Sequence, residues 1–172
     1  MKNLFIRIYG DSVLRKKASS ISKITLETRE LVSQMTDIMY KNKGAGLAAP
    51  QIGISERIII ADIGESHLVI INPEIRTREG EDVGDEGCLS IPGIIMGVKR
   101  AQRILVSGLD IHGETIKVKA SHLMARVLQH EIDHLNGILI VDYADSQKKE
   151  RIKGKLKKLK SKGARDKSST FS

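Results

Sequence analysis

Apolar residues recur at helical spacing in the segment between Thr25 and Gly44. They stand at i, i+4, i+7 and i+8, on one face of a helix: Leu31, Met35, Ile38 and Met39. The Thr25 side chain can cap the first turn, and Gly44 has the conformational freedom that often ends a helix. We therefore predict a first helix that runs from Thr25 to about Asn42.

A second segment, from Ser121 to Gly137, is apolar around most of its helical circumference. Its two neighbouring inward stripes hold Leu123, Val127, His130, His134, Met124, Leu128, Glu131 and Leu135. Its polar wedge is small and holds His122, Arg126, Gln129 and Asp133. Because a helix with so narrow a polar face is expected to be buried, this segment predicts a central helix with two inward histidines.

Short aliphatic runs bounded by turn residues predict strands in the rest of the chain. These runs lie at residues 57–62, 68–71, 103–107 and 115–119. We expect Asn72-Pro73 to stop the second run, and residues 110–113 to form a hairpin turn between the last two. The glycine-rich stretches 44–53 and 86–93 read as loops. The fold class that follows is α+β, with short antiparallel strands packed around the central helix.

The positive charge of the chain is concentrated at its C-terminal end. Residues 146–172 hold 11 of the 29 Lys and Arg residues and two of the 21 Asp and Glu residues, while the whole chain has a formal net charge of +8. Residues 1–145 are therefore nearly neutral, which argues against a nucleic-acid-binding core. Ile152, Leu156 and Leu159 predict a weak basic amphipathic helix, and we expect disorder from about Lys162.

Other features of the sequence restrict the class of protein. No apolar run approaches the roughly 20 residues of a membrane-spanning helix, and the N-terminus lacks the pattern of a secretory signal. The single cysteine, Cys88, cannot form an internal disulfide. We therefore expect a cytoplasmic protein without membrane contact.

The central helix carries a pattern with specific chemistry, His130-Glu131-Ile132-Asp133-His134. Two histidines four positions apart on one helix face can bind one metal ion. The glutamate beside the first histidine lies near that ion, where it can take a proton from water. The pattern therefore predicts a hydrolytic metal site, although an HExxH sequence also occurs by chance.

A catalytic site of this type needs a third protein ligand and one open position. The thermolysin-like pattern requires a downstream glutamate, and only Glu150, in the basic tail, follows the motif. The metzincin pattern requires a histidine at position 140, which is Ile140. Cys88 is the remaining soft ligand, although a lone cysteine is more often a small buried apolar residue. Cys88, His130 and His134 are thus the predicted metal ligands.

Three motifs together give the chain a close resemblance to the peptide deformylases. They are Gly44-Ala45-Gly46-Leu47-Ala48-Ala49-Pro50-Gln51, Glu86-Gly87-Cys88-Leu89-Ser90 and Gln129-His130-Glu131-Ile132-Asp133-His134-Leu135. The resemblance covers about residues 4–145. It implies a catalytic domain over residues 1–145, followed by a basic tail over 146–172 that is partly helical or disordered.

The resemblance implies removal of the formyl group from the N-terminal formyl-methionine of new proteins, with release of formate. The ion would be Fe²⁺, which Zn²⁺ or Ni²⁺ can replace, one per chain. Glu131 would act as general base and then as acid, and Gln51 and the Leu89 backbone N–H would stabilise the oxyanion. The substrate would pair with the backbone near Ala45, Gly46 and Gly87, and Leu123 and Val127 would line the methionine pocket.

Some positions depart from the family pattern, and two acidic residues have candidate ion-pair partners. The family often has a bulkier aliphatic residue at Ala45 and at Gly84. Glu86 is a candidate partner for Arg100. Asp133 is expected to face outward, as a surface charge or in an ion pair with Arg126 or another basic residue.

Two further interpretations of the sequence stay open. A different HExxH metalloprotease would cleave internal peptide bonds and keep its metal after Cys88→Ala. An RNA- or ribosome-binding protein would hold a closed structural metal, for which the sequence offers no obvious fourth ligand. The basic tail is by default a solvated segment, and its functional alternative is contact with ribosomal RNA. We expect no sequence-specific nucleic-acid binding.

Overall fold

The computed structural model describes residues 4–168 of the chain. Seven strands lie at Gly46–Ala48 (β1), Ile58–Ala61 (β2), Leu68–Glu79 (β3), Asp82–Glu86 (β4), Met96–Arg100 (β5), Arg103–Leu109 (β6) and Thr115–Ser121 (β7). Three α-helices lie at Leu26–Lys41 (α1), His122–Leu135 (α2) and Ser146–Ser168 (α3). Three short 3₁₀ helices lie at Ser12–Arg15, Ala49–Ile52 and Ile140–Tyr143. The predicted α+β class is confirmed.

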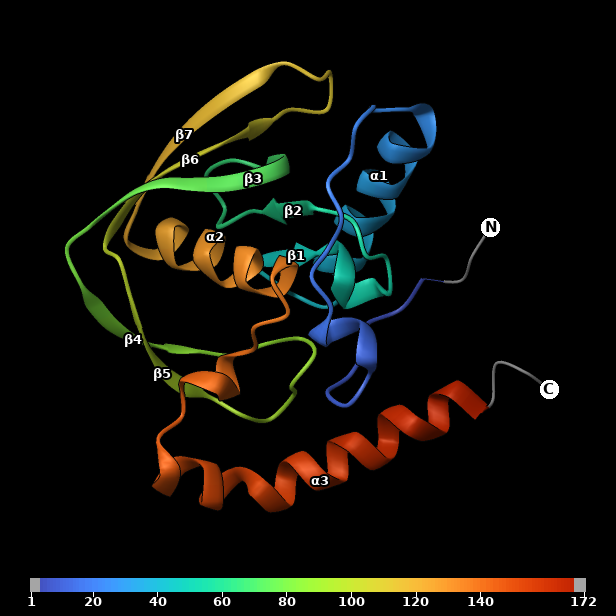
Figure 1. The fold of residues 1–172 in the computed structure, drawn as a ribbon, viewed down its shortest axis with the longest axis vertical. Coiled ribbons are helices and arrows are strands. Elements are labelled where there is room, and N and C mark those ends of the chain that lie inside the picture. Colours follow the sequence, from blue (N-terminus) through green and yellow to red (C-terminus); the bar gives the residue numbers. More distant parts are fainter. Residues whose placement is uncertain (1–3, 169–172) are drawn as a thin grey trace.

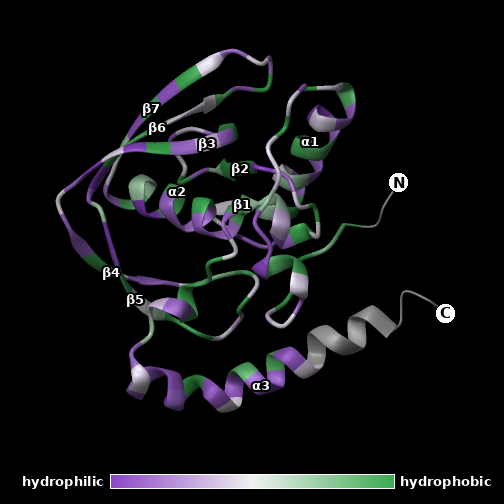
Figure 2. Ribbon diagram, viewed as in Figure 1, coloured by the Kyte–Doolittle hydropathy of each residue, from purple (hydrophilic) through white to green (hydrophobic). Residues whose placement is uncertain are grey.

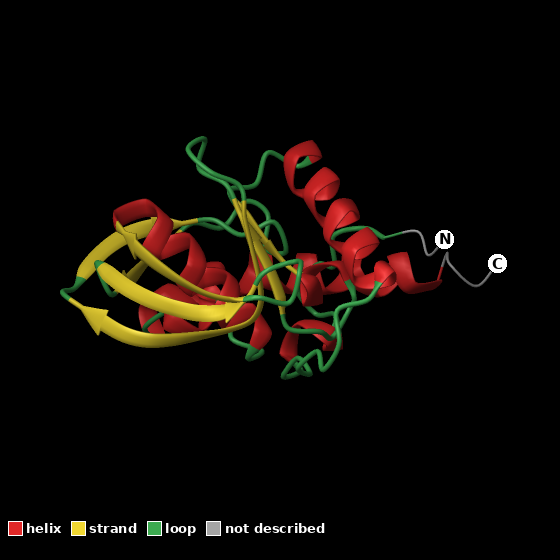
Figure 3. Ribbon diagram, turned by 90° about the horizontal axis from the view of Figure 1, so that it is seen from above, coloured by secondary structure: helices red, strands yellow, loops and turns green. Residues whose placement is uncertain are grey.

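The strands form two antiparallel sheets. The larger sheet has five strands in the order β1-β2-β3-β6-β7, and the smaller one pairs β4 with β5. Figure 1 shows α2 between the two sheets, with α1 beside the end of the larger sheet. Seen from above, the strands lie at one end and through the middle of the molecule, and helices occupy the other end (Figure 3). This arrangement buries both faces of α2 and so explains its narrow polar wedge.

Both helices predicted within residues 1–145 are confirmed, and each begins and ends near the expected residues. The Thr25 side chain accepts a hydrogen bond from the Thr28 N–H and caps α1. α2 follows Ser121 as expected, although the Ser121 hydroxyl makes no capping hydrogen bond. Gly137, just past the end of α2, has a positive φ of 74°. Glycine adopts this conformation without steric cost, which is why the helix ends there.

The strand predictions were wrong in two places and missed two strands. Asn72-Pro73 does not stop the run that begins at Leu68, because the pairing of β3 with β6 shifts register between Ile71 and Glu74. Such an irregularity places the proline where the ladder needs no N–H donor. Residues 46–48 form a short strand within the predicted loop 44–53. The strands β4 and β5 were not predicted at all, because their sequences lack a clear alternation of apolar and polar residues.

The basic tail forms a helix along the outside of the molecule. Figure 2 shows α3 as a mostly hydrophilic ribbon with apolar patches. Ile152, Leu156 and Leu159 pack against a cluster that includes Ile91 and Ile94. The helix extends to Ser168. Residues 169–172 of the predicted tail lie outside the described part of the chain.

Candidate active site

The two histidines of α2 bring their ring nitrogens together. His130 and His134 are one helical turn apart, and their Nε2 atoms lie 3.2 Å from each other. Both side chains are buried. Burial and the nearby positive charges of His130 and Arg100 lower the pKa of His134, which keeps its ring neutral, as a metal ligand must be. The rings therefore present two nitrogen donors to one point.

Cys88 completes a cluster of three donors. It lies in the loop after β4, and its Sγ is 3.3 Å from the Nε2 of His134. All three donor atoms lie within 4.8 Å of one another. A thiol and two imidazoles are the soft and borderline donors that bind Zn²⁺, Ni²⁺ or Fe²⁺. The residues present therefore fit a divalent transition metal.

Glu86 orients the ring of His130. The Oε2 of Glu86 lies 2.9 Å from the Nδ1 of His130. Burial would raise the pKa of Glu86, but hydrogen bonds from Arg100 and His130 outweigh burial and lower it to about 2. An ionised carboxylate only accepts hydrogen bonds, so Nδ1 carries the hydrogen and Nε2 points toward the donor cluster.

The surroundings of His130 favour the protonated form of its ring. Burial lowers the pKa of His130, but contacts with Cys88 and Glu86 outweigh burial and raise it well above its usual value. In the metal-free protein the ring therefore tends to be protonated. A cation that binds Nε2 would release this proton, which makes metal affinity dependent on pH.

Glu131 is a buried acid beside the donor cluster. Only 4% of its surface is exposed, and its Oε2 has no hydrogen-bond partner among the described residues. Burial raises the pKa of Glu131 to about 7. A carboxylate with a pKa near neutrality and a free oxygen can both accept and return a proton. The arrangement is therefore suited to acid–base chemistry.

Gln51 presents its amide N–H toward the cluster. Its Oε1 accepts a hydrogen bond from the Ala48 N–H at 2.8 Å, which fixes the orientation of the amide. Its Nε2 lies 3.7 Å from Cys88 Sγ and 3.4 Å from Ser90 Oγ. The Gln51 side chain is therefore a buried, fixed N–H donor next to the metal-ligand candidates.

A cavity of about 370 Å³ opens beside these residues. Ten of the predicted site residues line it: Ala45, Gly46, Gln51, Gly87, Cys88, Leu89, Leu123, Val127, His130 and Glu131. His134 does not line this cavity and lies behind it, fully buried. The structure thus brings all of the predicted site residues together in one place.

Arg126 lines this cavity, and the prediction of an exposed position for it was wrong. It was expected on the polar face of α2, yet only 8% of its surface is exposed. Its Nη1 donates to Glu86 Oε1 at 3.0 Å and to the Val98 carbonyl at 2.8 Å. Since the strands that cover it were not predicted, no local pattern indicated its burial.

The predicted pairing of Glu86 with Arg100 is confirmed. Two parallel hydrogen bonds of 2.9 and 3.0 Å join the Arg100 guanidinium to the Glu86 carboxylate. Asp133 also pairs with Arg100, at 2.6 Å, so its ion pair is with a basic residue other than Arg126. The remaining histidines, His67, His112 and His122, are exposed.

Comparisons with known proteins agree with this geometry. The family model described as polypeptide deformylase matches residues 4–150. The peptide deformylase of Thermodesulfovibrio yellowstonii is 46% identical over 162 residues, which cover 91% of this chain and 98% of that protein. The peptide deformylase of Halothermothrix orenii is 49% identical over 144 residues, which cover 83% of this chain and 94% of that protein.

Solved structures give the same result. A crystal structure of a peptide deformylase from Legionella pneumophila matches with a TM-score of 0.86 and 41% identity, covering 94% of this chain and 97% of that one. The peptide deformylase from Thermus thermophilus matches with a TM-score of 0.87 and 40% identity, covering 92% of this chain and 98% of that one. The chain therefore belongs to the peptide deformylase family of hydrolases.

Proposed function

We propose that this protein removes the formyl group from the N-terminal formyl-methionine of newly made proteins and releases formate. The observation that carries the proposal is the convergence of Cys88, His130 and His134 beside Glu131, at the wall of one cavity. Family membership supplies the reaction class. A buried acid next to a three-donor cluster supplies the means for hydrolysis of an amide.

Cys88, His130 and His134 would hold one Fe²⁺ per chain, and Zn²⁺ or Ni²⁺ would fit the same donors. When bound, such an ion supplies Lewis acidity, which polarises a carbonyl and lowers the pKa of water. Three protein ligands would leave one position open for water or substrate, as in catalytic rather than structural sites. Only Cys88, His130 and His134 come together as a candidate metal cluster within residues 4–168.

Glu131 would move the proton in both halves of the reaction. Its ionised form accepts a proton from the attacking water, and its protonated form then donates to the departing amine nitrogen. The raised pKa of about 7 suits both roles near neutral pH. The Gln51 amide and the Leu89 backbone N–H would stabilise the negative charge that develops on the formyl oxygen.

The substrate peptide would bind along the edge of the larger sheet. β1 is the first strand in that sheet, so one side of Gly46 has no neighbouring strand. An extended peptide could pair with the backbone there, near Ala45, Gly46 and Gly87. Leu123, which is 56% exposed, and Val127 would then receive the methionine side chain in the cavity.

The same proposal assigns catalysis to residues 1–145 and a targeting role to the tail of residues 146–172, in the cytoplasm. None of the described helices has both the length and the apolar character needed to cross a bilayer. α3 is strongly basic along its exposed face, which favours contact with ribosomal RNA near nascent chains.

Co-sedimentation with ribosomes at rising salt tests the tail. Lys153→Gln combined with Lys157→Gln and Lys158→Gln removes exposed charge while keeping the apolar contacts of α3. We expect weaker binding and a shallower dependence on salt. Unchanged binding would exclude this role for the tail without affecting the proposed reaction.

The experiment that tests the reaction compares substrates. Anaerobically prepared, Fe²⁺-loaded protein is given formyl-Met-Ala-Ser, acetyl-Met-Ala-Ser and an unmodified longer peptide. We expect formate from the first substrate, and no cleavage of internal bonds in the last. Cleavage of internal bonds without formate would favour a different HExxH protease, and metal retention by Cys88→Ala would support the same alternative.

A further inference from the structure

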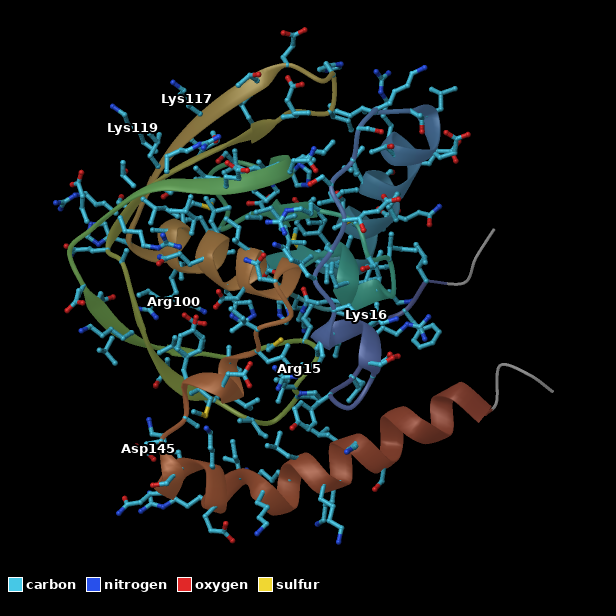
Figure 4. The ribbon with its side chains drawn as sticks, in the orientation of Figure 1. Arg15, Lys16, Arg100, Lys117, Lys119 and Asp145 are labelled. Carbon is cyan, nitrogen blue, oxygen red and sulfur yellow. The ribbon has the colours of Figure 1, made fainter. Side chains whose placement is uncertain are left out.

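Arg100 connects the strand that precedes Cys88 to the helix that carries the two histidines. It is the last residue of β5, and its side chain is 5% exposed. Two of its nitrogens bind both oxygens of Glu86, at 2.9 and 3.0 Å, and the third donates to Asp133 at 2.6 Å. Figure 4 shows Arg100 between α2 and the smaller sheet.

Both ends of this bridge adjoin candidate metal ligands. Glu86 is the last residue of β4 and stands two positions before Cys88. Asp133 stands next to His134 in α2, and Glu86 also accepts from the ring of His130. A rigid, planar guanidinium that binds both sides therefore restricts how far the Cys88 loop can move from the histidines.

Tyr143 holds Arg100 in place from the opposite side. It belongs to the 3₁₀ helix after α2, and its hydroxyl donates to Asp133 at 2.7 Å while it accepts from Arg100 at 3.1 Å. The Arg100 guanidinium carbon lies 4.8 Å from the centre of the Tyr143 ring, which adds a cation–π contact. Arg100 thus has a partner for each of its three nitrogens.

We propose that Arg100 is a positioning residue that sets the separation between Cys88 and the two α2 histidines. It acts through Glu86, and Asp133 and Tyr143 fix its own position. Arg100 does not line the cavity beside Glu131, so it has no contact with substrate there. This inference rests on the proposed function only in taking Cys88, His130 and His134 as ligands of one ion.

Stability alone is a weak reason for such a network. Buried ion pairs recover little more than their desolvation cost, and apolar replacements often leave a protein equally stable. Arg100 pairs with Glu86 and Asp133, and Arg126 pairs with Glu86 and Asp82, so acidic partners neutralise both buried guanidinium groups. Apolar side chains could fill the same space, but they could not hold the metal ligands in a fixed geometry as this hydrogen-bonded network does.

Metal release by the Co²⁺-loaded full chain tests the proposal. Arg100→Met removes all of the hydrogen bonds, Arg100→Lys keeps the charge without the planar fork, and Tyr143→Phe removes one hydroxyl. The matched control is Arg103→Met, since Arg103 forms an exposed ion pair with Glu79. The readouts are the affinity for Co²⁺ against a competing chelator, the dissociation rate, and the thiolate-to-cobalt absorption band.

Arg100→Met should lower Co²⁺ affinity about 10- to 100-fold and shift the thiolate band, and Arg100→Lys should restore little of the loss. Tyr143→Phe should speed Co²⁺ release about fivefold, because it removes the hydrogen bonds that the hydroxyl makes with Asp133 and Arg100. Arg103→Met should match the wild type. Wild-type Co²⁺ affinity and a wild-type spectrum in Arg100→Met would overturn the proposal. If Arg100→Met does not fold, the same result in Tyr143→Phe would overturn it.

The outcome is separable from that of the proposed function. Altered Co²⁺ binding by the variants, with no formate from the wild type, would keep the positioning role and reject the reaction. Formate from the wild type, with normal Co²⁺ binding by the variants, would reject the positioning role alone.

Discussion

Gly46 lies so close to Glu131 that no side chain fits between them. A β-carbon at position 46 would lie 2.6 Å from Oε1 of Glu131 and 2.8 Å from Cγ1 of Val127. Real β-carbons essentially never make contacts this short, so both side chains, or β1 itself, would have to move. The glycine therefore keeps the edge of β1 within reach of the buried acid.

Gly46→Ala should displace Glu131 and reduce formate release about 100-fold, because small errors in the position of a catalytic group are costly. The metal content should stay at the wild-type level, since the three donors are not displaced. Gly154→Ala is the control, because nothing lies within 4 Å of a β-carbon at that position. Wild-type turnover by Gly46→Ala would show that Glu131 tolerates displacement.

Gln51→Met keeps the length of the side chain and removes its amide. The turnover number should fall about 10²- to 10³-fold, while KM and metal content change little, since the lost hydrogen bond acts on the transition state. Steady-state kinetics with formyl-Met-Ala-Ser gives both constants. A rise in KM with unchanged turnover would assign Gln51 to substrate binding instead.

The ionised Glu86 carboxylate should stabilise the fold in a defined pH window. Its pKa is lowered from 4.5 to about 2, so its contribution is complete above about pH 4.5 and is lost as the pH falls toward 2. Urea unfolding should show Glu86→Gln less stable than the wild type at pH 6, by on the order of 3 kcal/mol, and the difference should shrink at pH 3. An equal difference at both values would contradict this expectation.

The ionised Glu131 carboxylate should destabilise the metal-free protein, whereas ionised Glu86 stabilises it. Its pKa is raised from 4.5 to about 7, so ionisation costs stability as the pH rises through this range. Glu131→Gln should therefore be more stable than the wild type at pH 8 and close to it at pH 5. Thermal unfolding of both proteins in the presence of a chelator gives the comparison. Equal melting temperatures at pH 8 would show that burial does not destabilise the ionised acid.

The sequence predicted the elements in which apolar residues recur at regular spacing. The helix from Thr25 and the hairpin around 110–113 were found because caps, turns and apolar spacing agree there. β3 was cut short because Pro73 normally ends a strand, and only the register shift between Ile71 and Glu74 admits it. That shift depends on the partner strand, which a local pattern cannot show.

The candidate site was easier to predict than its surroundings. Cys88, Gln51 and the histidines were found because each is a chemical group in a recognisable motif. Arg126 was misplaced because its burial depends on β4 and β5, whose sequences show no clear alternation. The contact between Tyr143 and Arg100 joins residues 43 positions apart, and no spacing rule indicates it.

The most direct test of the proposed reaction measures formate released from formyl-Met-Ala-Ser by Fe²⁺-loaded wild type and Glu131→Gln, with the metal content of both. We predict one ion per chain in each protein, and a rate for Glu131→Gln that is about 10²- to 10⁴-fold lower. Comparable formate release by the two proteins, or none by the metal-loaded wild type, would contradict it.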